Sequence, residues 1–146
     1  MKAEFALPFV LAACLSGCTS VDVRPLPAEN HITNVLIREN PKVAVDDFLD
    51  VLIEGFERHG IATKVVSETA DVKDAYVVTY VAHLTWDLKP YLVRATINIE
   101  KESHRIAHAE YHLVGGGGLD VMKWEGTKAK IGPVIDELLK GFNKSG

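Results

Sequence analysis

The chain has few cysteines, no surplus of positive charge and no apolar run long enough to cross a membrane as a helix. Its two cysteines are Cys14 and Cys18, and the apolar run at residues 5–15 is interrupted only by Pro8. A membrane-spanning helix needs about 20 apolar residues, so this run is too short. The formal net charge of -4 excludes a general nucleic-acid binder, which needs a concentrated basic surface.

Motifs of common catalytic sites are also missing. Neither G-x-S-x-G nor H-E-x-x-H occurs, and the D-D-x-x-D motif at residues 46–50, which binds magnesium in large all-helical enzymes, is interpreted here as the solvated start of a helix. His108 and His112 are roughly 13 Å apart on an expected strand, too far to share a metal. We therefore expect no catalytic residue, no metal and no cofactor, and an enzyme is the third choice among the function classes.

What the sequence does contain is a processing signal at its start. A positive region with Lys2 and the apolar run at residues 5–15 are typical of a secretory signal. The following Leu15-Ser16-Gly17-Cys18 resembles the lipobox of bacterial lipoprotein precursors. This resemblance implies diacylglyceryl attachment to Cys18, removal of residues 1–17 and acylation of the new amine. Two or three acyl chains on one cysteine give durable anchoring.

The residue after Cys18 bears on location. In the lipoprotein family an aspartate there retains the product in the inner membrane, whereas this chain has Thr19. The resemblance therefore favours the periplasmic face of the outer membrane, although the sequence leaves other membrane faces open. Since Cys14 leaves with the signal and Cys18 carries lipid, no thiol remains for a disulfide, a metal or a nucleophile.

Residues 18–30 are predicted to form the lipidated cysteine and an extended tether. They contain Pro25 and Pro27, show no apolar periodicity, and prolines favour extended backbone. The alternation of Val21 and Val23 leaves open a first edge strand. Residues 31–146 are predicted to form a single domain.

The domain begins with a β-α-β pattern. An apolar stretch at residues 32–39 predicts a strand, and Asn40-Pro41 is a typical helix start. Apolar residues then recur at helical spacing until His59-Gly60, which is a typical helix end. Residues 61–68 predict the second strand.

The following segment has a period of two, which predicts three antiparallel strands. Their apolar faces are formed by Tyr76, Val78, Tyr80, Ala82, Leu84 and Trp86, then Tyr91, Val93, Ala95, Ile97 and Ile99, then Ala107, Ala109, Tyr111 and Leu113. Turns are expected at residues 87–90 and near Ser103. A second amphipathic helix is expected to begin near Thr127, with Pro133 marking either a kink or a late first turn. The prediction is an α+β fold: a β-α-β unit, an antiparallel β-meander and a C-terminal helix, with about five strands and two helices on one face.

Aligning the apolar faces of the meander predicts its register. His83 lies beside Arg94 and Arg94 beside His112; Val81, Thr96 and Glu110 form a second row, and Thr79, Asn98 and His108 a third. An arginine between two histidines disfavours a cation and suits an anionic or carboxylate partner. The predicted interaction surface comprises His83, Arg94, His112, Glu110 and Trp124, with a plain solvated sheet face as the alternative.

The glycine run at residues 115–118 is not followed by the lysine and hydroxyl of a phosphate loop. We interpret it as a bend or bulge after the last strand.

Several segments, at residues 110–113, 116–119, 123–127 and 133–139, resemble a set of small proteobacterial lipoproteins. This resemblance implies the same α+β domain on a lipid anchor and supplies no catalytic residues. The favoured function is a membrane-anchored, non-enzymatic interaction or assembly module of the cell envelope with a protein partner. The alternative is a periplasmic binder of a small anionic ligand or a peptidoglycan fragment, at the His83, Arg94 and His112 row or beside Trp124. The oligomeric state stays open.

Overall fold

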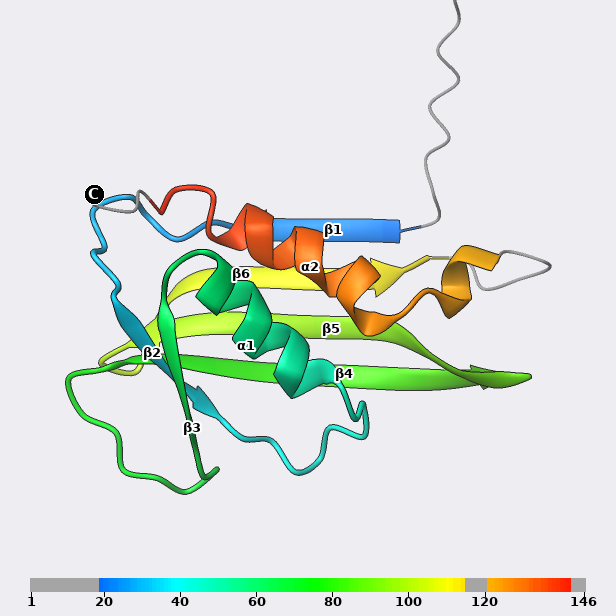
Figure 1. Ribbon diagram of the computed structural model, residues 1–146, viewed down its shortest axis with the longest axis horizontal. Coiled ribbons are helices and arrows are strands. Elements are labelled where there is room, and N and C mark those ends of the chain that lie inside the picture. Colours follow the sequence, from blue (N-terminus) through cyan, green and yellow to red (C-terminus); the bar gives the residue numbers. More distant parts are fainter. Residues whose placement is uncertain (1–18, 115–120, 143–146) are drawn as a thin grey trace, which may run out of the picture.

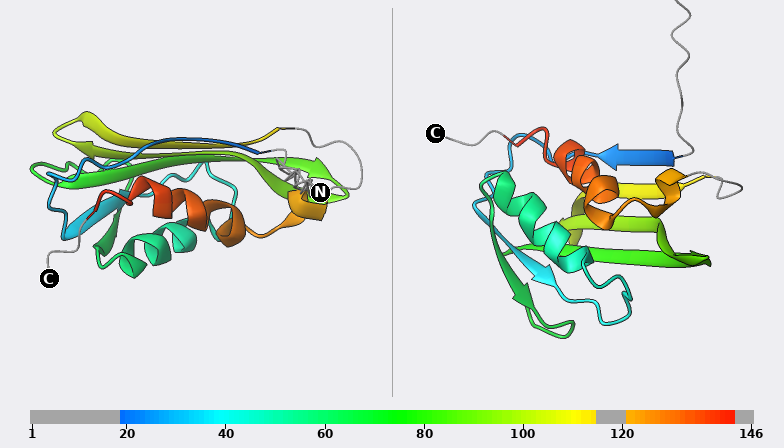
Figure 2. Two further views of the ribbon diagram at one scale, coloured as in Figure 1. Left: turned by 90° about the horizontal axis from the view of Figure 1, so that it is seen from above. Right: turned by 45° about the vertical axis from the view of Figure 1, so that its right-hand side comes forward.

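Six strands form one sheet, and both helices pack against the same face of it (Figure 1; Figure 2). The computed structural model describes residues 19–114 and 121–142. The expected signal, Cys18 and the glycine run lie outside the described residues. The α+β class is confirmed, but the sheet has six strands where about five were expected.

The strands are β1 (Thr19–Arg24), β2 (Asn34–Arg38), β3 (Ala62–Val66), β4 (Tyr76–Asp87), β5 (Lys89–Lys101) and β6 (His104–Leu113). Their order across the sheet is β1-β6-β5-β4-β2-β3. β2 runs parallel to β3 and β4, and the remaining pairs are antiparallel. β1 and β3 therefore form the two edges.

The predicted tether is wrong for the part that the structure describes. Thr19–Arg24 pairs with β6 over its whole length, from Thr19 opposite Leu113 to Arg24 opposite His108. The alternation of Val21 and Val23, left open as an edge strand, is the correct signal, because both valines lie on the side of the sheet that carries Tyr111 and Ala109. Leu26 then enters the core, and its backbone N–H donates to Leu138 O at 2.8 Å.

The β-α-β unit is confirmed, but its helix begins later than predicted. α1 (Phe48–Arg58) starts at Phe48, not at Asn40. Asn40 instead caps a turn: its Oδ1 accepts from Lys42 N–H at 3.1 Å, and its Nδ2 donates to Tyr80 O at 2.9 Å. The helix end is as predicted, with Gly60 at φ 79° and its N–H donating to Glu57 O.

Because α1 starts later, Asp46 and Asp47 precede the helix and are not part of its first turns. The Asp47 carboxylate accepts from Thr127 Oγ1 at 2.6 Å and so joins the starts of the two helices. No group of three His, Cys, Asp or Glu side chains within residues 19–114 and 121–142 could hold a metal ion.

The meander has the predicted strands and turns. Leu88 lies between β4 and β5 with φ 62°, and Glu102 and Ser103 join β5 to β6 with φ 50° and 65°. Every predicted row is found: His83–Arg94–His112, Val81–Thr96–Glu110 and Thr79–Asn98–His108. The register follows from alternation because a one-residue slip would move every apolar side chain to the wrong face.

One end of the meander departs from the predicted alternation. A bulge follows the His83–Arg94 pair, so that Leu84 pairs with Leu92 and Val93 is the extra residue. Leu84 and Trp86, expected on the buried face, are 39% and 71% exposed. Figure 1 shows the reason: the β4–β5 hairpin extends past the ends of α1 and α2 (Thr127–Leu138).

After β6 the described chain resumes with the short helix η1 (Val121–Trp124) and α2 (Thr127–Leu138). α2 begins at the predicted Thr127 and carries Pro133 inside it. The core lies between the helices and the sheet; its fully buried side chains include Phe48, Leu52 and Phe56 of α1, Ile131, Ile135 and Leu138 of α2, and Val78, Ile97 and Ile99 of the sheet. None of the described helices is long and apolar enough to span a bilayer.

Candidate functional site

The sheet face opposite the helices is left open by the described chain, as the view from above in Figure 2 shows. We call this surface the outer face. The name covers the part of this face on four strands: Ser20, Asp22 and Arg24 of β1, His108, Glu110 and His112 of β6, Arg94, Thr96 and Asn98 of β5, and Thr79, Val81 and His83 of β4. Polar side chains dominate it because the apolar half of each strand faces the helices.

The outer face has three straight rows that cross four strands. The first row consists of Ser20, His112, Arg94 and His83. The second consists of Asp22, Glu110, Thr96 and Val81, and the third of Arg24, His108, Asn98 and Thr79. The structure thus brings four of the five predicted site residues together. Sequence reasoning missed the β1 contribution, for which the alternation of residues 19–24 was the available signal.

The surroundings of Arg94 differ from those predicted. Its Nε lies 3.9 Å from Glu110 Oε1 in the neighbouring row, and both side chains are nearly half exposed. Diagonal neighbours on adjacent strands are within reach of long side chains, so this pair follows from the register. An exposed pair of this kind contributes little stability, roughly 0–1 kcal/mol. The Glu110 carboxylate partly neutralises the charge of Arg94, so a dedicated anion site in the first row is less favourable.

The third row is held by side-chain hydrogen bonds. His108 Nδ1 and Asn98 Oδ1 are 2.7 Å apart, and Asn98 Nδ2 donates to Thr79 Oγ1 at 3.4 Å. Thr79 Oγ1 in turn donates to Glu100 Oε1 at 3.4 Å. These contacts orient polar groups along the sheet, so this part of the outer face is preformed.

Within the three rows of the outer face the charges balance. Arg24 and Arg94 carry two positive charges, and Asp22 and Glu110 carry two negative ones, with the histidines taken as neutral. Asp22 and Glu110 are directly opposite each other, a repulsive arrangement that the nearby Arg94 offsets. A balanced mosaic of both signs matches the mixed surface of a protein better than it matches a polyanion.

Trp124, the fifth predicted site residue, does not belong to the outer face. It lies in η1 on the side of the helices, and its Nε1 donates to Asp87 O at 3.3 Å. It lines a separate cleft of about 350 Å³ that also includes Leu84, Lys89 and Thr127. Grouping Trp124 with the histidine and arginine row is therefore corrected by the fold.

Two buried lysines secure this region and were missed by sequence reasoning. Lys123 is 1% exposed and its Nζ pairs with the Asp87 carboxylate. Lys130 Nζ donates to Lys123 O at 2.6 Å and to Leu92 O at 3.2 Å. The Lys123 ammonium also lies 4.5 Å from the centre of the Trp124 ring. Together these contacts fix η1 to the β4–β5 hairpin.

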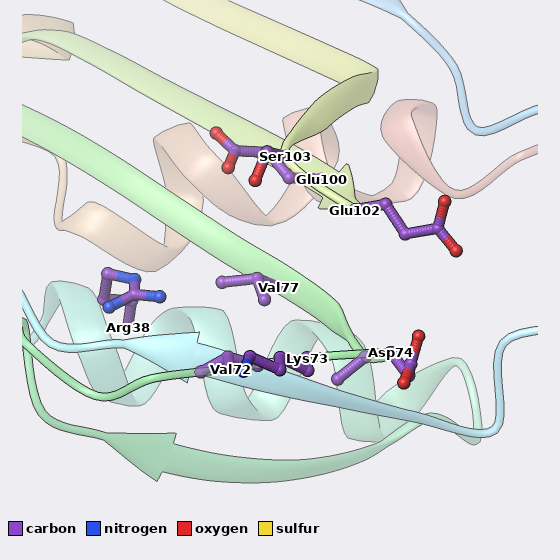
Figure 3. A pocket seen from close by; sticks show the side chains of 9 residues that line it. Arg38, Val72, Lys73, Asp74, Val77, Glu100, Glu102 and Ser103 are labelled. Carbon is purple, nitrogen blue, oxygen red and sulfur yellow. The ribbon is translucent and has the colours of Figure 1, made fainter.

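A second cleft, of about 340 Å³, lies at the opposite end of the sheet (Figure 3). Arg38 lines it but is committed to the connection before β4, because its Nη1 donates to Glu68 O and Ala70 O. Glu100, Glu102 and Asp74 come from different segments, and Figure 3 shows that their carboxylates do not converge. The cleft is open and of mixed charge, so we assign it no ligand.

No protein-family model matches the chain, and no curated protein matches it. A solved structure with a similar fold is the PelC dodecamer from Paraburkholderia phytofirmans. The TM-score is 0.56 at 12% sequence identity, and the match covers 84% of this chain and 96% of that chain. At this identity the likeness concerns the fold alone.

Proposed function

We propose that this protein is a lipid-anchored, non-enzymatic interaction module of the bacterial cell envelope, placed at the periplasmic face of the outer membrane. The anchor is proposed from the lipobox-like sequence ending in Cys18. The observation that supports an interaction role is the outer face: three ordered polar rows that no described helix covers.

The chemistry of the outer face favours a protein partner over a small anion. The charges of its three rows balance, Arg94 is engaged by Glu110, and Val81, at the β4 end of the second row, is 41% exposed. Interfaces between proteins combine apolar and polar contacts of this kind. A small anionic ligand would instead need converging cations, and the two arginines of the outer face lie in different rows.

Site-specific photo-cross-linking in intact cells tests the partner. A photoreactive residue at Val81 should give a discrete adduct, whereas one at the exposed Asp50 of α1 should not. The adduct should be lost with Arg94→Ala and kept with Arg105→Ala, which removes an exposed arginine at the far end of β6. Equal adducts at Val81 and Asp50, or none at either, would count against an interaction surface on the outer face.

The anchor has its own test. Labelled palmitate should enter the wild-type chain and be absent from Cys18→Ala. Equal labelling of both, or no labelling of the wild type, would remove the lipid anchor from the proposal.

Self-assembly is a second candidate function, because both edges of the sheet are open in the described structure and the fold neighbour PelC is a dodecamer. Each edge strand carries an exposed valine, Val21 on β1 at 49% and Val65 on β3 at 39%. Head-to-tail pairing of unlike edges gives rings or filaments.

Analytical ultracentrifugation of the purified mature chain tests this candidate. Val21→Lys and Val65→Lys should each lower the oligomer mass, while Val81→Lys on the outer face should not, since a charge on an edge strand opposes pairing. A monomeric wild type would exclude self-assembly as the function.

A further inference from the structure

Exposed apolar side chains gather at one end of the sheet. Leu84, Trp86 and Leu88 of the β4–β5 hairpin are 39%, 71% and 82% exposed, and Val114, which follows β6, is 50% exposed. The β5–β6 turn at the opposite end is polar, with the sequence Lys101-Glu102-Ser103-His104. A soluble surface normally scatters such residues singly, so their concentration at one hairpin indicates contact with an apolar partner.

The N-terminal end of β1 lies at this same end of the sheet (Figure 1). The first row of the outer face contains Ser20 of β1 and His83 of β4. Thr19 and Leu84 each lie one residue beyond this row, toward the same end of the sheet. The hairpin continues from His83 to Asp87, four residues or roughly 13 Å past the row. Thr19 is joined directly to Cys18, and successive Cα atoms are only about 3.8 Å apart. Because β1 replaces the expected tether, no long spacer separates Cys18 from this end.

We infer that the tip of the β4–β5 hairpin, with Trp86 and Leu88, inserts into the headgroup region of the bilayer beside the lipid anchor. This inference rests on the anchor at Cys18, which is part of the proposed function. Tryptophan and leucine are the residues that interfacial membrane contacts favour, and the exposed Lys89 next to them suits anionic headgroups.

The hairpin is held rigidly enough for such a contact to orient the domain. The Asp87 carboxylate pairs with buried Lys123, and Asp87 O accepts from Trp124 Nε1. The tip thus gives the domain a second point of contact besides the acyl chains. With two contacts at one end of the sheet, the strands stand up from the membrane and the outer face is presented sideways to envelope partners.

The test compares two hairpin tips in the lipidated protein. Leu88→Cys and Ser103→Cys place a thiol at turn positions with similar backbone, φ 62° and 65°, at opposite ends of the sheet. Each variant is labelled with an environment-sensitive fluorophore and bound to vesicles of phosphatidylethanolamine and phosphatidylglycerol. Emission from position 88 should shift to the blue and be quenched by headgroup-level spin-labelled lipid, while position 103 should stay solvent-like.

Three results would overturn the inference, and they separate it from the proposed function. If the protein is lipidated and vesicle-bound but position 88 stays solvent-like, the anchor stands and membrane insertion of the tip fails. If position 88 is shielded before vesicles are added, a second copy of the chain covers the tip. If the protein neither takes up palmitate nor binds vesicles, the anchor and the inference fail together.

Discussion

Adding a single methyl group at Gly55 tests the contact between the two helices. Gly55 lies in the middle of α1, and a Cβ there would be 2.6 Å from Ile135 Cδ1 and 3.0 Å from Ile135 Cγ2 in α2. Replacing a helical glycine by alanine stabilises a helix by about 1 kcal/mol. Overpacking a core costs roughly 1–3 kcal/mol, and Ile135 is fully buried. Gly55→Ala should therefore lower the free energy of unfolding by up to about 2 kcal/mol.

A double-mutant cycle isolates the cause. Ile135→Val deletes the Cδ1 atom that makes the shortest contact and costs roughly 0.5–1.5 kcal/mol by itself. In that background Gly55→Ala should be neutral or stabilising, because the helix-propensity gain remains while the worst overlap is gone. The coupling between the two changes should exceed about 1 kcal/mol, within the range of roughly 0.5–3 kcal/mol that contacting residues show.

Urea denaturation of the mature chain, followed by far-UV circular dichroism, measures these differences. Gly132→Ala in α2 is the matched control, since a Cβ there would meet no atom within 4 Å. It should leave stability unchanged or raise it by up to about 1 kcal/mol, the gain being limited by the following Pro133. Equal effects of Gly55→Ala and Gly132→Ala, or additive effects of Gly55→Ala and Ile135→Val, would refute the close α1–α2 contact.

Three further predictions follow from individual contacts. Partial burial of Asp136 favours its neutral form, but hydrogen bonds and charge from His59 and Arg58 lower the pKa of this carboxyl overall. The ionised carboxyl of Asp136 therefore stabilises the fold above the unfolded carboxyl pKa of about 4, and this stabilisation is lost as the pH falls through the lower folded pKa. Asp136→Asn should reduce the loss of stability at acidic pH. Asp71→Asn, which changes an exposed ion pair, should not. Burial, together with the charge of Glu125, raises the pKa of Tyr111 to about 12. The folded state thus favours the neutral phenol, and the stability that this contributes should be lost as the pH rises from the unfolded pKa of about 10 to about 12. An ultraviolet titration should show a phenol that ionises at about pH 12 in the wild type and is missing in Tyr111→Phe. Asn40→Ala should cost about 1–3 kcal/mol by removing the turn contacts to Lys42 and Tyr80, with no loss of helical circular dichroism; a loss of helix would contradict the late start of α1.

The meander was the most predictable part of the fold. Strict alternation and two short turns determine which side chains face each other, so the rows containing Arg94, Thr96 and Asn98 follow from the sequence. The bulge at Val93 was not predictable in this way. Tyr91, Leu92 and Val93 are all apolar, so alternation alone does not say which of them is the extra residue.

Two errors come from signals that have two meanings. Asn40-Pro41 suits a turn as well as a helix start, and the hydrogen bond of Asn40 to Tyr80, forty residues away, decides between them. Residues 19–24 suit a tether as well as an edge strand, and pairing with β6 decides in favour of the strand. In both cases the deciding partner is distant in the sequence.

The sequence by itself determined the α+β class, the three rows of the meander, the C-terminal end of α1 and the start of α2, because local periodicity and turn residues specify these features. Only the tertiary structure decided that β1 completes the sheet, that Arg94 lies against Glu110, and that Trp124 packs with Asp87 away from the outer face. It also decided that Trp86 and Leu88 are exposed at the end where β1 begins. The physical reason is that alternation assigns a side chain to a face of its strand, whereas its burial depends on which helices and strands pack beside it.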